Sequence, residues 1–136
     1  MSQKLMIFVC ILLLASAFRL ADPLSDSINR GKDVYTTNCV ACHQADGKGI
    51  AKVFPPLAKS DYLMADKERS IAQVLYGADK EMVVNGETYN VPMLGFSALS
   101  DQEIADVLNY VRNTWGNKGK IVTAEEVAKE RKKKKK

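Results

Sequence analysis

Two cysteines and a histidine stand close together in the segment Cys39-Val40-Ala41-Cys42-His43. Two thiols at this spacing can each add to one vinyl group of the same haem, while the imidazole that follows binds the iron. The C-x-x-C-H pattern is typical of covalent haem attachment. We therefore predict that Cys39 and Cys42 bind one haem c and that His43 is the first axial ligand of its iron.

Other kinds of site also use closely spaced cysteines. A structural zinc site needs four ligands, but the chain has one histidine, and its third cysteine, Cys10, lies in an apolar N-terminal segment. Zinc is therefore excluded by ligand count. A thioredoxin-type dithiol is expected beside a βαβ pattern, which these flanks lack, and a plain disulfide leaves His43 without a role. Both remain open as alternatives that explain less of the motif.

The iron needs a second axial ligand or an open position. Because His43 is the only histidine, two histidine ligands from this chain are excluded, and methionine is the natural candidate. Met93 lies in a segment, residues 90–96, whose proline and glycine allow a side chain to point inward. Met64 is near a helix start and Met82 adjoins a hairpin, where methionine is more often ordinary packing. We predict that Met93 is the second ligand.

Helices are predicted on both sides of a long loop. Ser25 or Asp26 can cap a helix that runs into Cys39, which places the motif at a helix end. Two glycines and two prolines between residues 44 and 60 exclude long regular structure there. A short helix is then expected over residues 66–76, with apolar residues on one face and a glycine directly after it.

The second half of the chain carries the strongest local signals. An Asn-Gly pair within residues 83–89 predicts a small two-stranded hairpin. Ser100 and Glu103 form a capping-box pattern before a helix whose apolar face runs to Trp115, with Gly116 placed to end it. Spacing of this kind predicts a core helix.

The first 17 residues have the pattern of a signal peptide. Lys4 supplies a positive charge, residues 5–14 are almost wholly apolar, and Ala15-Ser16-Ala17 offers a cleavage site. The apolar run is shorter than the ~20 residues that cross a bilayer, although an uncleaved anchor remains the alternative. We predict a signal peptide over residues 1–17 and export to the periplasm, an oxidising compartment.

Charge is divided unevenly over a chain whose 136 residues suffice for one domain. The net charge is +4, but without Lys4 and the basic run 131–136 the body has 13 basic and 16 acidic residues, a balance of −3. Nucleic-acid binding is therefore not expected.

Thr123 and Glu126 predict a last capped helix, which loses its apolar face in a polybasic tail. The tail is expected to be disordered, and either solubilises the protein or meets an acidic partner or a membrane surface.

Together these motifs resemble class I, mitochondrial-type cytochrome c, and especially the small bacterial periplasmic monohaem domains found alone or fused to oxidoreductases such as copper nitrite reductases. The likeness covers a domain over residues 25–116, followed by the C-terminal helix and tail over residues 117–136. The motifs that carry it, besides the C-x-x-C-H segment and Met93, are Gly31-x-x-x-Tyr35, Asp46-Gly47-Lys48-Gly49, Phe54-Pro55-Pro56-Leu57, Ser60-Asp61-Tyr62-Leu63, Val84-Asn85-Gly86, Tyr89-Asn90, and the pattern of residues 99–111.

The resemblance implies an all-α fold, with three main helices and one or two short ones around the haem and a small β-hairpin flap. It implies that the carbonyl of Pro56 accepts a hydrogen bond from His43, that Leu57 covers the haem, and that Met93 is the sixth ligand. Gly31 would let the first helix cross the helix from residue 100 closely, with Tyr35 packed nearby. The family usually places proline directly after the ligand methionine, whereas here proline precedes it.

The implied activity is single-electron transfer between redox proteins through small, transient contacts, without catalysis. Two filled axial positions leave no site for a substrate. Two other classes stay open. A ligand-binding haem sensor would follow if Met93 does not bind the iron, and the chain is otherwise equally suited to be the cytochrome subunit of a larger oxidoreductase.

Overall fold

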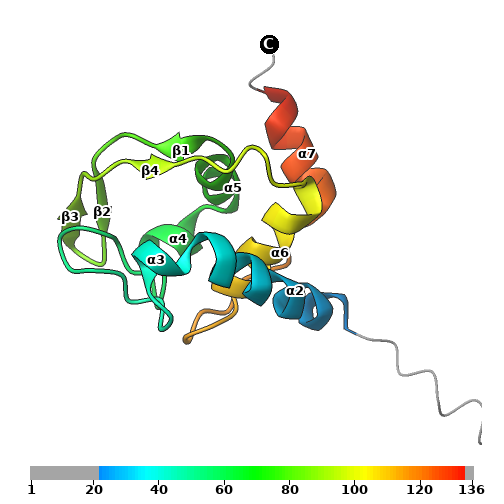
Figure 1. The fold of residues 1–136 in the computed structure, drawn as a ribbon, viewed down its shortest axis with the longest axis horizontal. Coiled ribbons are helices and arrows are strands. Elements are labelled where there is room, and N and C mark those ends of the chain that lie inside the picture. The colour runs from blue at the N-terminus through cyan, green and yellow to red at the C-terminus, as the bar shows by residue number, and fades with distance from the viewer. Residues whose placement is uncertain (1–21, 134–136) are drawn as a thin grey trace, which may run out of the picture.

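Helices wrap around one another and two small β-ladders lie at one end of the molecule (Figure 1). The computed structural model describes residues 22–133, so the predicted signal peptide and the last three lysines lie outside the described residues. The elements are α2 (Pro23–Asn38), α3 (Val40–His43), α4 (Asp61–Ala65), α5 (Lys67–Tyr76), β1 (Gly77–Ala78), β2 (Met82–Val84), β3 (Glu87–Tyr89), β4 (Met93–Leu94), α6 (Asp101–Val111) and α7 (Ala124–Lys133). The predicted helical fold with a hairpin flap is confirmed.

The crossing of α2 and α6 is the central contact of the fold (Figure 1). A Cβ atom built on Gly31 would lie 1.9 Å from the carbonyl oxygen of Asp106 and 2.9 Å from Cβ of Tyr110, so only glycine fits at the crossing. Tyr35 follows one turn later, with its ring centroid 5.3 Å from that of Tyr110. The close crossing predicted from Gly31 and Tyr35 is confirmed.

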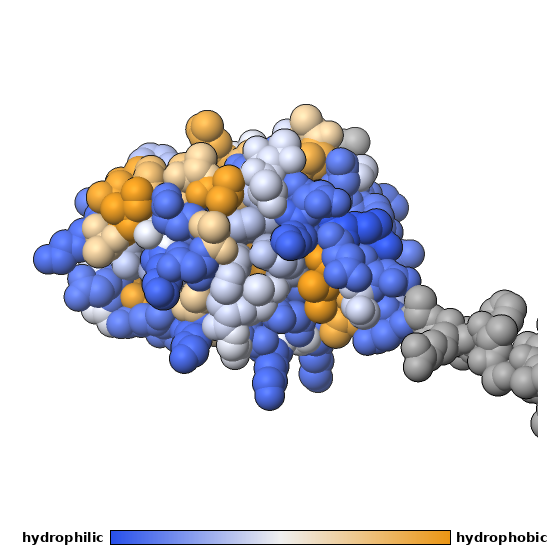
Figure 2. Space-filling view, turned by 60° about the horizontal axis from the view of Figure 1, so that its bottom comes forward, coloured by the Kyte–Doolittle hydropathy of each residue, from blue (hydrophilic) through white to orange (hydrophobic). Residues whose placement is uncertain are grey.

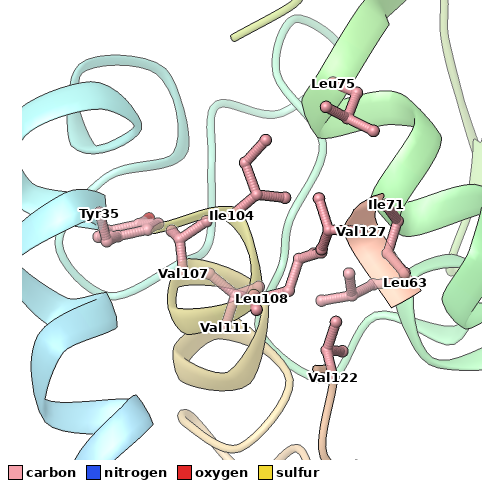
Figure 3. Close-up of a cluster of buried hydrophobic side chains, with 11 residues drawn as sticks. Tyr35, Leu63, Ile71, Leu75, Ile104, Val107, Leu108, Val111, Val122 and Val127 are labelled. Carbon is pink, nitrogen blue, oxygen red and sulfur yellow. The ribbon is translucent and has the colours of Figure 1, made fainter. Parts of the chain in front are cut away.

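The apolar core lies where α2, α5, α6 and α7 meet (Figure 3). Ile104 and Leu108 of α6 are fully buried, which matches the face predicted from their spacing. Val127 brings α7 into the same cluster, next to Ile71 of α5 (Figure 3). Burial of Val127 in this way stabilises the packing of α7 on α5 and α6.

Helix ends differ from the predicted ones at two places. α2 begins at Pro23 because the side chain of Asp22 accepts a hydrogen bond from the amide of Leu24, so neither predicted cap is used. α6 keeps the capping box of Ser100 but ends at Val111 instead of near Trp115. The side chains of the next residues bond back to α6 carbonyls, and Trp115 itself has φ of 54°, outside the helical range.

The hairpin of β2 and β3 turns at Asn85 and Gly86, which have φ of 52° and 84°. Positive φ at both central residues is the geometry that Asn-Gly favours, so this prediction is confirmed. The short helix α4, capped by Ser60, and the pairing of β1 with β4 were not predicted. The β1–β4 ladder joins residues far apart in sequence, and each strand has only two residues, too few for a periodic signal.

The C-terminal helix α7 starts with the predicted cap, since Thr123 and Glu126 exchange hydrogen bonds. It continues as a helix to Lys133, and in its last turn Arg131 pairs with Asp101 and Lys133 with Glu68. The expectation of a disordered tail is therefore wrong as far as Lys133, because these side chains bind the acidic body. Within residues 22–133 there is no helix both long and apolar enough to cross a bilayer.

Candidate functional site

The C-x-x-C-H motif lies at the junction of two helices. Cys39 is both the C-cap of α2 and the N-cap of α3. Its carbonyl accepts hydrogen bonds from the amides of Cys42 and His43, at 3.2 and 3.0 Å. The two thiols therefore share one turn, and they are free, with Cys39 half-buried and Cys42 exposed. Burial, and then the neighbouring Cys42, raise the pKa of Cys39 to about 11. A reactive dithiol needs the opposite shift, which disfavours the thioredoxin-type alternative.

One nitrogen of the His43 ring is fixed by the backbone. Nδ1 lies 3.0 Å from the carbonyl oxygen of Pro55, and because a carbonyl only accepts, Nδ1 carries the proton. The predicted acceptor, Pro56, was wrong by one residue. Burial lowers the pKa of His43 more than the Pro55 contact raises it, so the ring is neutral at pH 7. Nε2 is left with a lone pair, the state in which imidazole binds a metal.

The loop after the motif folds back to present Pro55. The amide of Gly49 donates to the carbonyl of His43, and the carbonyl of Gly47 accepts from the amides of Leu57 and Ala58. Gly47 has φ of 67°, and a Cβ on it would lie 2.5 Å from the Trp115 ring. These backbone contacts turn the chain directly after Pro56, which explains why the preceding carbonyl faces the histidine.

The side chains of Tyr35, on α2, and of Asn117, in the segment after α6, hold both ends of this loop. The Tyr35 hydroxyl donates to the carbonyl of Gln44 at 2.6 Å, where α3 ends. Buried Asn117 donates to the carbonyls of Leu57 and Val111, at 2.8 and 2.7 Å. Sequence reasoning singled out Tyr35 but missed Asn117, since a lone asparagine after a helix carries no periodic or motif signal.

The three methionines considered as ligands occupy different elements. Met64, on α4, packs against the buried core, and Met82 opens β2 opposite Tyr89. Met93 is half-buried in β4, paired with Ala78. Both α3 and β4 lie in the half of the molecule away from α7 (Figure 1). Met82 and Met93 are thus both held by backbone ladders, and of the three only Met64 packs against the core.

Apolar side chains near these segments are left exposed. Ile50 and Val53 follow the histidine, while Val91 and Leu94 flank Met93, and Leu94 is 80% exposed. Figure 2 shows apolar surface gathered at the end of the molecule that carries the strands. Free thiols three residues apart, a neutral imidazole with a fixed Nδ1, a thioether and unpaired apolar surface together fit a haem.

Comparison with known proteins gives a consistent result. The family model described as cytochrome c matches residues 28–115. Cytochrome c-552 of Thermus thermophilus is 39% identical over 127 residues, which cover 87% of this chain and 85% of that protein. The cytochrome c subunit of a quinone-dependent alcohol dehydrogenase from Gluconobacter oxydans is 42% identical over 90 residues, covering 65% of this chain.

The chain matches only a small part of the length of the dehydrogenase subunits. The chain spans 19% of the length of the Gluconobacter subunit, and 25% of the gluconate 2-dehydrogenase cytochrome c subunit of Pantoea cypripedii, to which it is 35% identical. The relatives named here include no copper nitrite reductase, so the likeness to the cytochrome domains fused to those enzymes stays an analogy.

Proposed function

This chain belongs to the cytochrome c family, so it is a haem protein that carries electrons, and from that premise we propose that it binds one haem whose iron has His43 and Met93 as axial ligands. The observation that carries the proposal is the fixed His43 ring. Its Nδ1 is held by Pro55 at 3.0 Å, and its neutral state leaves Nε2 free for the metal.

Cys39 and Cys42 would hold the haem through thioether bonds, and the bound group supplies a reversible one-electron couple at its iron. Residues of the chain would set the properties of this couple. The Pro55 carbonyl accepts a hydrogen bond from Nδ1 of His43, which raises the basicity of the other ring nitrogen, Nε2. A methionine sulfur as the other ligand favours the reduced state and a high potential. Leu57, whose carbonyl accepts a hydrogen bond from Asn117, would cover the haem and exclude water.

Electron exchange at such a site requires only that a redox partner protein come close to the haem. With both axial positions filled, no substrate binds the iron, and small transient contacts with redox proteins suffice. We propose that the apolar side chains of residues 50, 53, 91 and 94 lie at that contact, because exposed apolar patches mark interaction sites. Export to the periplasm, inferred from the signal-peptide pattern of residues 1–17, would place the chain where haem attachment to free thiols occurs.

A second candidate is a cytochrome subunit of a dehydrogenase. It is favoured by the relatives named as cytochrome c subunits of alcohol and gluconate dehydrogenases. The electron-transfer chemistry would be the same, but the partner would be permanent. Purification from native membranes and periplasm decides between the two: a free carrier elutes alone, whereas a subunit elutes with a dehydrogenase in fixed stoichiometry.

Substitution of the three methionines tests the axial ligand. The oxidised protein should show the weak long-wavelength sulfur-to-iron absorption band, and Met93→Ala should abolish it, because the thioether is lost. Met64→Ala and Met82→Ala are matched controls that should keep the band. Reduced wild-type protein should bind carbon monoxide slowly or not at all. Rapid binding by wild type, or loss of the band in either control alone, would refute the assignment and favour a ligand-binding haem sensor.

A further inference from the structure

The last turn of α7 reaches across to the chain segment that follows Met93. Arg131 makes three hydrogen bonds there: Nε donates to the Asp101 carboxylate, Nη1 to the Ser97 carbonyl and Nη2 to the Leu99 carbonyl, each at 2.8 Å. The Arg131 side chain is three-quarters buried. A planar, charged group in which each of the three nitrogens donates one hydrogen bond gives strong and geometrically specific contacts.

The same turn of α7 also holds the other side of the Met93 ladder. The hydroxyl of Tyr76 lies 3.3 Å from the carbonyl oxygens of both Glu130 and Arg131. Tyr76 ends α5 and directly precedes Gly77, the β1 residue that faces Leu94. One helical turn therefore binds both the segment that follows the Met93 strand and the residue that precedes the partner of that strand.

Close backbone packing connects the segment that Arg131 binds with Met93 and the end of α5. A Cβ on Gly77 would lie 2.3 Å from the Met93 carbonyl oxygen, and one on Gly95 would lie 2.6 Å from the carbonyl carbon of Tyr76. The amide of Phe96 donates to the carbonyl of Val74 at 2.8 Å. Residues 93–96 therefore lie against the end of α5, and the chain then meets the Arg131 side chain at Ser97 and Leu99.

We propose that Arg131 is a positioning residue for the axial methionine: it holds residues 97–101 and, through them, keeps the Met93 strand in place. The inference rests on the proposed function, in which Met93 binds the iron. It assigns a role to α7, a helix outside the region matched by the family model, which ends at residue 115. In this role α7 acts as a clamp on the segment that carries the methionine ligand.

Competition by imidazole tests the clamp in the haem-containing protein. Imidazole can bind the oxidised iron only after the Met93 segment moves away, so its apparent affinity scales with the fraction of open molecules. Arg131→Ala should lower the apparent imidazole Kd about tenfold, equal to about 1.4 kcal/mol. Arg131→Lys keeps the charge but loses the fork, and should behave nearly like Arg131→Ala.

Two variants serve as matched controls. Arg30→Ala removes a comparable charge-assisted pair, to Asp106, but between α2 and α6. It should lower the melting temperature and leave the imidazole Kd within twofold of wild type. Lys132→Ala removes one positive charge from an exposed side chain beside Arg131, and should change neither quantity. An equal Kd shift in Arg30→Ala and Arg131→Ala would overturn the proposal, since general destabilisation would then explain it.

Amide hydrogen exchange gives a readout independent of the ligand. The amides of Phe96 and Leu99 should exchange at least tenfold faster in Arg131→Ala than in Arg30→Ala. If Met93→Ala shows that Met93 is not a ligand, the proposed function fails and imidazole binding reports nothing on the clamp. Unchanged exchange would then overturn the clamp separately. Faster exchange with an unchanged imidazole Kd, in protein that has the sulfur-to-iron band, would also refute the positioning role.

Discussion

Replacing Gly31 by alanine tests the crossing on which the haem-binding half of the fold depends. The added methyl group would start 1.9 Å from the Asp106 carbonyl oxygen, and real Cβ contacts lie beyond 3.0 Å, so the two backbones must separate by roughly 1 Å. A gap of that size forfeits a quarter to a half of the dispersion energy of each contact across it. The obstacle is backbone, so no side chain can rotate away to relieve it.

The expected cost follows from two opposing effects. Overpacking a close contact costs about 3 kcal/mol at the upper end of the usual range, while alanine returns about 1 kcal/mol of helix propensity relative to glycine. The free energy of unfolding should therefore fall by about 2 kcal/mol. For a domain of this size that corresponds to a drop in melting temperature of about 8 °C.

Thermal unfolding of the haem-containing protein, followed by circular dichroism at 222 nm, measures this drop. Gly86→Ala is the matched control, since nothing lies within 4 Å of its Cβ position and only the positive φ of 84° penalises it. That backbone penalty is about 1 kcal/mol, so the control should lose about half as much. A melting temperature for Gly31→Ala equal to that of wild type, or no lower than that of Gly86→Ala, would show that α2 and α6 do not cross as described.

Two further predictions concern α6. Ser100→Ala removes the capping box at its start and should lower the unfolding free energy by about 1 kcal/mol, measured by denaturant titration; an unchanged midpoint would contradict the cap. Burial raises the pKa of Asp106, but hydrogen bonds from Arg30, Ser27 and Gln102 outweigh it, and the net pKa is lowered. A lowered folded pKa adds stability above about pH 4 that is lost as the pH falls. Stability should therefore decline more steeply below pH 4 in wild type than in Asp106→Asn, and parallel acid titrations would refute this.

Features written in adjacent residues were predictable from the sequence. The Asn85-Gly86 turn and the caps at Ser100 and Thr123 each depend on a few neighbouring residues, and all form as expected. The close crossing at Gly31 came from the family resemblance, and its cause, the carbonyl of Asp106, lies 75 positions further along the chain and is visible only in the structure.

Features that depend on distant partners were missed or misplaced. Which proline carbonyl faces His43 depends on how the loop folds back through the Gly47 carbonyl, and no local rule separates Pro55 from Pro56. The basic run looked like a disordered tail because its charges have no partners in sequence. In the structure Arg131 finds its carboxylate at Asp101. Buried Asn117 was missed for the same reason, since both carbonyls that it binds are set by tertiary contacts.

The two sides of the proposed iron site are stabilised by different physics. The His43 side rests on ring packing, a buried amide and a backbone carbonyl within a loop that Tyr35 and Asn117 hold at both ends. The Met93 side rests on a ladder of two-residue strands and on polar contacts from α7. Short ladders and partly exposed hydrogen bonds open at lower free energy than packed cores do. The methionine should therefore be the ligand that leaves first under denaturant or competition, while His43 stays bound.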